Sequence, residues 1–391
     1  VVAGIATFHS NINANGNIVG DDSTNISGIN TIGANFYYGC GGVGSRLFQN
    51  DVCGNFIAGA SAGAAVTTTN SVKFNIMIGC NAGKKVSTSC YNIMMGSNAG
   101  CCISTGNGQN TLIGGSAGNK LGQEGGEGNG NTFLGYLAGA YPTNAEMNVA
   151  IGHEAGKGTL GCTGGACNIA IGFRAGCLQK SSNNNNIFIG RLTGLANSTG
   201  CDNIFMGDTA GYCNISGGNN LAFGQEALRC NLSGGMNITL GKCAGKCATT
   251  ASNNILLGCS AGCCGFGNNA YNVAIGDQAG KCASGNATQN TLLGTNSGMN
   301  LTEGFNTFLG ASAGVSATAA KCNVVIGYIA GSGLTCGHCN VYIGQCAGAG
   351  FKTGTANISI GSRSGPNAGG NGTGKCNIIL GQCNADVLTT G

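Results

Sequence analysis

Residues 203–241 read NIFMGDTAGYCNISGGNNLAFGQEALRCNLSGGMNITLG, and this stretch decides the fold. The pattern Asn-x-x-x-Gly-x-x-Ala-Gly starts at Asn203 and begins again at Asn220 and Asn237. It recurs from residue 55 to the C-terminal end at intervals of about 18 residues, most often 17. We number the positions of each copy from its first Asn, which is position 1. Nineteen asparagines open the copies: Asn55, Asn75, Asn92, Asn110, Asn131, Asn148, Asn168, Asn186, Asn203, Asn220, Asn237, Asn254, Asn272, Asn290, Asn306, Asn323, Asn340, Asn357 and Asn377.

The repeat predicts an all-β fold, a parallel β-solenoid (β-roll or β-helix) of about 19–20 coils. Two glycines in most copies disfavour helix, whereas tight corners require them. We expect a β-rich stalk or connector at 1–34, the solenoid at 35–385 and a short tail at 386–391. The composition agrees with a folded chain: 76 glycines come with only 2 prolines, which excludes collagen, and 42% of residues are hydrophobic, which argues against disorder.

Positions 2 to 4 alternate as a short strand, with mainly aliphatic residues at positions 2 and 4. We expect these two positions to form the core and the middle position 3 to face outward. Position 3 is also mostly apolar, so we expect it to be buried by self-association, as three identical rods that pack their apolar faces along a common axis. End-to-end contact between solenoids, which would build a filament, is a separate expectation from the uncovered strand edge at the end of the repeats. The alternative is that another segment of each coil covers it within a flattened monomer. The largest side chains of this predicted self-association face are Phe133, Phe188, Phe205, Leu256, Leu292, Phe308 and Tyr342.

The Asn at position 1 predicts a ladder of side-chain amides, each hydrogen bonded to the Asn of the next coil. A second column is formed by cysteines at position 11 in five successive copies. These are Cys213, Cys230, Cys247, Cys264 and Cys282. We interpret it as a buried row of reduced thiols, while stacked coils would also bring the cysteines within disulfide distance. Soft-metal binding is a further alternative, but paired Cys-x-x-Cys motifs of zinc-finger spacing are missing.

Several functional classes find little support in the sequence. The 13 acidic residues are scattered, so no carboxylate pair suggests an enzyme, and the 17 basic residues form no dense run that would suggest nucleic-acid binding. Asn interrupts every apolar stretch, so we expect no membrane span. We predict no catalytic residue, no metal site and no cofactor.

The stretches GIATFHSNINANGNI and DDSTNISGINTIG near the N-terminus resemble the β-rich stalks of bacteriophage tail fibres, particularly those of cyanophages. The copies NVAIGHEAG, NTFLGYLAG and NIAIGFRAG resemble the Cys-rich solenoid repeats of such proteins and are similar to the head repeats of trimeric autotransporter adhesins. The resemblance implies a homotrimeric fibre on a virion or cell surface.

We therefore expect a non-enzymatic structural fibre, extracellular or on a virion, that provides reach and attachment, with a cell-surface glycan or receptor as a possible partner. One alternative is a solenoid that binds polysaccharide or ice. Ice binding would call for regular outward rows of Thr, and position 2 carries Thr in only four copies. A solenoid enzyme that degrades polysaccharide is another alternative, and it would align acidic residues on one face of the coils.

Overall fold

The computed structural model describes residues 45–50, 53–66, 72–104, 108–123, 128–160, 162, 164–180, 183–366 and 372–383. The predicted stalk at 1–34 and tail at 386–391 lie outside these residues. The described part contains twenty strands and no helix. The strands are β1 (Ser45–Asn50), β2 (Phe56–Ala60), β3 (Ile76–Ile78), β4 (Ile93–Met95), β5 (Thr111–Ile113), β6 (Thr132–Leu134), β7 (Val149–Ile151), β8 (Ile169–Ile171), β9 (Ile187–Ile189), β10 (Ile204–Met206), β11 (Leu221–Phe223), β12 (Ile238–Leu240), β13 (Ile255–Leu257), β14 (Val273–Ile275), β15 (Thr291–Leu293), β16 (Thr307–Leu309), β17 (Val324–Ile326), β18 (Val341–Ile343), β19 (Ile358–Ile360) and β20 (Ile378–Leu380).

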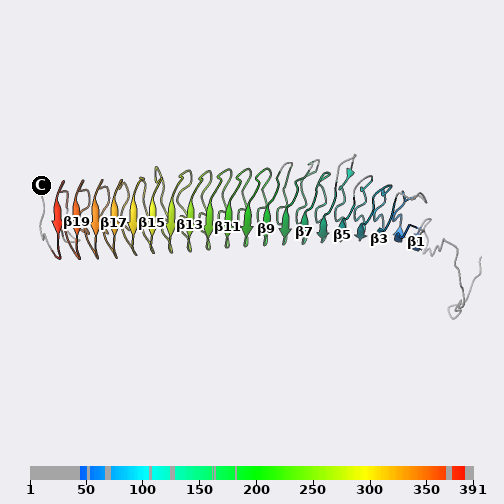
Figure 1. Ribbon diagram of the computed structural model, residues 1–391, viewed down its shortest axis with the longest axis horizontal. Coiled ribbons are helices and arrows are strands. Elements are labelled where there is room, and N and C mark those ends of the chain that lie inside the picture. Colours follow the sequence, from blue (N-terminus) through cyan, green and yellow to red (C-terminus); the bar gives the residue numbers. More distant parts are fainter. Residues whose placement is uncertain are drawn as a thin grey trace, which may run out of the picture. The chain divides into compact units, whose positions relative to one another are not determined.

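The predicted β-solenoid is confirmed. Strands β2 to β20 form one parallel sheet in which each strand pairs with the next one in the chain (Figure 1). Equivalent residues of neighbouring copies are partners, as in the pair Phe205 and Ala222 of β10 and β11. Only β1 runs antiparallel, against β2. One copy of the repeat is therefore one coil, and stacking the coils builds the solenoid.

The glycine at position 5 allows neighbouring coils to approach closely. A Cβ atom on Gly207 would lie 2.6 Å from the carbonyl carbon and oxygen of Gly224 in the next coil, and its φ of +128° is strained for other residues. At position 9, the φ of Gly211 is +57° and an added Cβ would strike the ring of Phe205. These contacts explain why glycine recurs at both positions.

The interior of the solenoid is filled by position 3 of each strand. Its side chains are buried along the stack, as the rings of Phe188 and Phe205 illustrate with centroids 5.6 Å apart. The alanine at position 8, such as Ala210, is buried as well. These two positions supply most residues of the core clusters, and position 12 adds others such as Leu121, Leu301 and Leu334.

The expectation that position 3 faces outward is wrong. Every strand from β3 to β20 has a buried middle residue between two more accessible ones. Positions 1 and 3 of a strand point to the same side, so an interior Asn at position 1 also turns position 3 inward. The residues assigned to a self-association face therefore lie inside their own coils: Phe133, Phe188, Phe205, Leu256, Leu292, Phe308 and Tyr342.

Candidate functional site: the outer face of the sheet

The column of position-1 asparagines holds successive strands in register. In each successive pair, the backbone N–H of one Asn donates to the Oδ1 of the preceding Asn, at 2.8–3.1 Å. In most pairs the Nδ2 group donates to the same oxygen, as from Asn220 to Asn203 at 3.1 Å. The amide thus acts as donor and acceptor at once, which a strand position facing a neighbour above and below requires.

The same amides also close each coil. Asn203 Nδ2 donates to the carbonyl oxygen of Gly217, fourteen residues later in the same copy, at 2.8 Å. A second and shorter amide column lies at position 12, where Asn214 donates to Asn197 and Asn231 donates to Asn214, each at 2.6 Å. This column was not predicted from the sequence, although Asn at position 12 of three successive copies was a visible signal.

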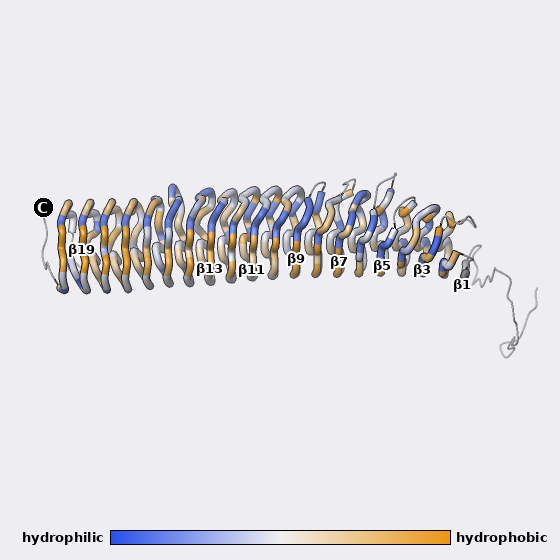
Figure 2. Tube along the Cα trace, in the orientation of Figure 1, coloured by the Kyte–Doolittle hydropathy of each residue, from blue (hydrophilic) through white to orange (hydrophobic). Residues whose placement is uncertain are grey.

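With the interior assigned, positions 2 and 4 of the strands form the outer face of the sheet. We call these two columns the outer face. Figure 2 shows hydrophobic residues recurring at the strands along the solenoid. Two residues from each of the nineteen parallel strands give 38 side chains, and none of them is buried. Leu134, Leu293 and Leu309 are 45%, 41% and 40% exposed.

The outer face carries no charge over its whole length. All 38 residues are apolar except four threonines, which are Thr111, Thr132, Thr291 and Thr307. Together these side chains expose on the order of 2,000 Å² of apolar surface, whereas the largest apolar patch of a typical monomer covers about 300–600 Å². Eighteen of these nineteen strands have only three residues, so the face is a narrow strip about 7 Å between its two columns.

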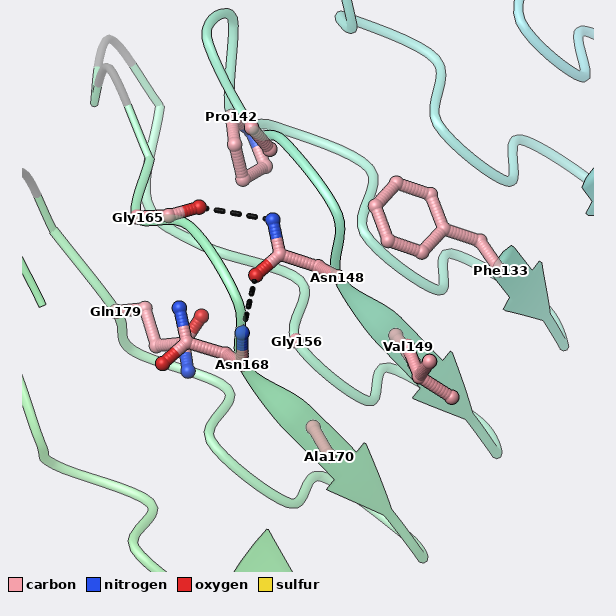
Figure 3. A pocket seen from close by; sticks show the side chains of 11 residues that line it. Phe133, Pro142, Asn148, Val149, Gly156, Gly165, Asn168, Ala170 and Gln179 are labelled. Atoms are coloured by element: carbon pink, nitrogen blue, oxygen red, sulfur yellow. Dashed lines mark hydrogen bonds between the residues drawn. The ribbon is translucent and has the colours of Figure 1, made fainter. Parts of the chain in front are cut away.

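A packing defect lies in the interior at strands β7 and β8. Small middle residues, Ala150 and Ala170, leave a cavity of about 10 Å³ that Phe133, Pro142 and Gln179 also line (Figure 3). This volume suits a single water molecule at most and is too small for a ligand.

The amide column is also weakest at this defect. Asn148 donates to Gly165 O at 2.8 Å and accepts from the backbone N–H of Asn168 at 2.8 Å (Figure 3). The Nδ2 group of Asn168 donates to Asn183 O instead of to Asn148. One link of the column is thus missing here.

The predicted cysteine column occupies equivalent positions of successive coils, but it is not buried. Cys213, Cys230 and Cys247 are half-buried, and Cys264 and Cys282 are exposed. They are free thiols. Position 11 directly precedes the buried position 12, and its own side chain stays accessible to solvent. The expectation of an interior row is therefore wrong.

A charged cluster lies at the Gly-x-x-Ala-Gly corner of the coils near β7 and β8. Glu154 pairs with Lys157 at 2.8 Å and with Arg174 of the next coil at 2.6 Å. The hydrogen bond from Lys157, followed by that from Arg174, lowers the pKa of the Glu154 carboxyl despite its burial. The cluster is a satisfied ion-pair network that joins two coils, not a pair of carboxylates arranged for catalysis.

Beside this cluster, three rings stack on the outside of successive coils. The ring centroids of Tyr136 and His153 are 5.3 Å apart, and those of His153 and Phe173 are 5.5 Å apart. The guanidinium of Arg174 covers Phe173 at 5.9 Å. Tyr136 and Phe173, at the two ends of this stack, are 54% and 45% exposed.

In the described part of the chain, no three or more His, Cys, Asp or Glu side chains are placed to hold a metal ion together. No helix of sufficient length and hydropathy to cross a membrane occurs among the described residues. In comparisons with known proteins, no family model, no curated protein and no solved structure matches the chain.

Proposed function

We propose that the chain is a non-enzymatic structural fibre protein whose solenoids associate with copies of themselves through the outer face. The observation that carries the proposal is the uncharged, apolar strip formed by positions 2 and 4 along nineteen strands. Positions 2 and 4 thus replace position 3 as the predicted self-association face. Its area is in the range of obligate homo-oligomer interfaces, which run from about 2,000 Å² upward.

A second copy of the chain is the partner that best fits this strip. The strip repeats with the spacing of the coils, so an identical strip on a parallel solenoid matches it coil by coil. It offers no charged group that would select a polar ligand. We expect a trimer around a common axis, because the two columns can then each contact a different neighbour. Such a fibre would serve reach and attachment on a virion or cell surface.

The oligomeric state of the purified full chain tests the proposal. Light scattering at micromolar concentration should give three chains per particle, and a monomer would contradict self-association. A dimer would retain the outer face as the interface but overturn the trimer. The variant Ile238→Lys with Leu240→Lys places two charges on β12, where the side chains are 37% and 39% exposed. It should release monomers with unchanged circular dichroism.

A matched control adds the same two charges away from the strip. Gln225 and Thr295 are exposed at position 6 of their coils. The variant Gln225→Lys with Thr295→Lys should therefore associate like the wild type. If both double variants associate equally, the outer face is not the interface.

A further inference from the structure

Five successive coils each carry one cysteine at position 11, where the side chain stays accessible to solvent. We call Cys213, Cys230, Cys247, Cys264 and Cys282 the thiol column. The proposed self-association does not involve them, because they lie outside the strands that form the outer face. They are all free thiols.

Backbone hydrogen bonds place each of these cysteines opposite the next one. In a parallel ladder, an N–H group donates to the residue that precedes its partner. The column follows this rule at four successive steps, with N–H to oxygen distances of 2.7–2.9 Å: Cys213 to Arg229, Cys230 to Lys246, Cys247 to Cys263 and Cys264 to Lys281. Each acceptor directly precedes the next cysteine of the column.

Their separation suits a covalent link. Parallel neighbours lie about 4.8 Å apart, and the Cα atoms of disulfide-bonded cysteines are usually about 4.4–6.8 Å apart. Neighbouring thiolates of the column also repel each other electrostatically. Burial raises the pKa of Cys247, and the neighbouring Cys230 and Cys264 raise it further. Because the cysteines of the column are half-buried or exposed, a small oxidant can reach them.

We propose that the thiol column is a site of oxidative modification, in which cysteines of neighbouring coils join as disulfides. A small disulfide such as glutathione disulfide serves as the oxidant. One column thiolate attacks it and forms a mixed disulfide, releasing one small thiol. The neighbouring thiolate then displaces the second small thiol. Each coil-to-coil bond thus oxidises two cysteines and reduces one oxidant molecule, and the two protons end on the released thiols.

The odd number of thiols has a consequence for the pairing. Two disulfides between neighbours leave one thiol free, and that thiol is Cys213, Cys247 or Cys282. The free thiolate can attack the adjacent disulfide and release the cysteine on its far side. The reduced position therefore moves along the solenoid by two coils at each exchange, without any net oxidation.

The test is to oxidise the folded full chain with glutathione disulfide and to map its disulfides by mass spectrometry after blocking free thiols. Four of the five column thiols should be lost, with links only between neighbouring coils. The blocked thiol should be found at Cys213, Cys247 or Cys282. Free thiols throughout the column would overturn the proposal. A dominant link between Cys264 and the adjacent Cys263, whose Sγ atoms lie 3.9 Å apart, would also overturn it.

Two matched variants test the neighbour rule itself. Cys247→Ser leaves two complete neighbouring pairs, so four column thiols should still be lost. Cys230→Ser isolates Cys213 and leaves three successive thiols, so only two should be lost. Both variants replace one thiol by one hydroxyl in the same column, and circular dichroism should show both folded. Equal loss in the two variants would contradict pairing between neighbours.

Discussion

At the scale of the residue, position 1 shows why the repeat opens with asparagine. The side chain accepts from the next coil through Oδ1 and donates through Nδ2 to the preceding coil and to the end of its own coil, as Asn220 does. Aspartate has no donor and would bury a charge, while serine is too short to reach both neighbours. The side-chain amide therefore connects neighbouring coils to each other and also connects the start of its own coil to its end.

Removing one such amide should weaken the solenoid locally. Asn220→Ala removes the bonds of Asn220 Nδ2 to Asn203 and Gly234, and it deprives Asn237 of its acceptor. Because these groups are buried, we expect a local cost of about 2–4 kcal/mol. Hydrogen exchange at the amides of β10 to β12 should accelerate accordingly.

Gln225→Ala, an exposed position on the same coil, serves as the control for this variant. It should leave the exchange rates near those of the wild type. Equal protection in the two variants would show that the amide column contributes little to stability.

A second prediction concerns the vicinal thiols Cys101 and Cys102, whose Sγ atoms lie 3.6 Å apart. The hydrogen bond from Cys101, opposed by burial and assisted by Lys85 and Lys120, lowers the pKa of Cys102 from 9.0 to about 6. A lowered acid pKa stabilises the folded chain fully above pH 9, and this contribution is lost as the pH falls through 6.

The ultraviolet absorbance of the thiolate measures this titration. The difference between the wild type and Cys102→Ser should show a midpoint near pH 6 in the folded protein. Cys101→Ala should raise the midpoint, because the donated hydrogen bond is gone. Cys80→Ala, which removes an exposed thiol of the preceding coil, should not change it. A midpoint near 9 in the folded protein would contradict the prediction.

At the scale of the element, the residues inside one coil compensate for each other's size. Position 9 is Gly in most coils, and in the coil of Phe205 a Cβ atom on Gly211 would strike the phenyl ring. Where position 3 is Ala222, position 9 is the buried Leu228, even at a φ of +52°. Likewise Phe266 is buried in the coil next to Ala274, in the same core cluster. No such residue compensates for Ala150 and Ala170, and a cavity remains there.

This compensation can be tested by a double-mutant cycle. Ala222→Phe alone should clash with Leu228, and Leu228→Gly alone should leave a void costing about 2–5 kcal/mol. The double variant recreates the arrangement of Phe205 and Gly211 and should be more stable than either single variant. Thermal unfolding measures the three differences, and additive effects would show that the two positions do not share a space.

The strands could be predicted from the sequence, but hydrophobicity alone did not show which side of each strand faces the interior. Positions 2, 3 and 4 are all mostly apolar, so alternation shows which residues share a side without showing which side is inside. The Asn column contained the missing information. An amide with four hydrogen bonds must be interior, and Asn220 shares its side with Ala222. The candidate outer face was therefore assigned to the wrong column, although the apolar strip itself was visible.

At the scale of the whole molecule, each coil contacts only its two neighbours in the stack. A solenoid of this kind gains stability approximately in proportion to its coils. Deleting Asn220 to Met236, which is one complete coil, should join β10 to β12 without disturbing either. The product should stay folded and be shorter by about 4.8 Å, measurable by small-angle X-ray scattering.

The control is a deletion of Asn220 to Leu228, which removes part of a coil. It puts the following residues out of phase with the interior, so that amides and core side chains no longer meet their partners. Amide protection around the deletion should be lost. If the partial deletion is tolerated as well as the complete one, the coil is not the structural unit.

The missing amide link between β7 and β8 has a mechanical consequence. When a solenoid is pulled along its axis, every coil-to-coil interface carries the same force, so the weakest interface sets the breaking load. Between Asn148 and Asn168 one amide bond is absent and the core beside it contains a small cavity. The solenoid should therefore part at this point first under tension, leaving two blocks of intact coils on either side.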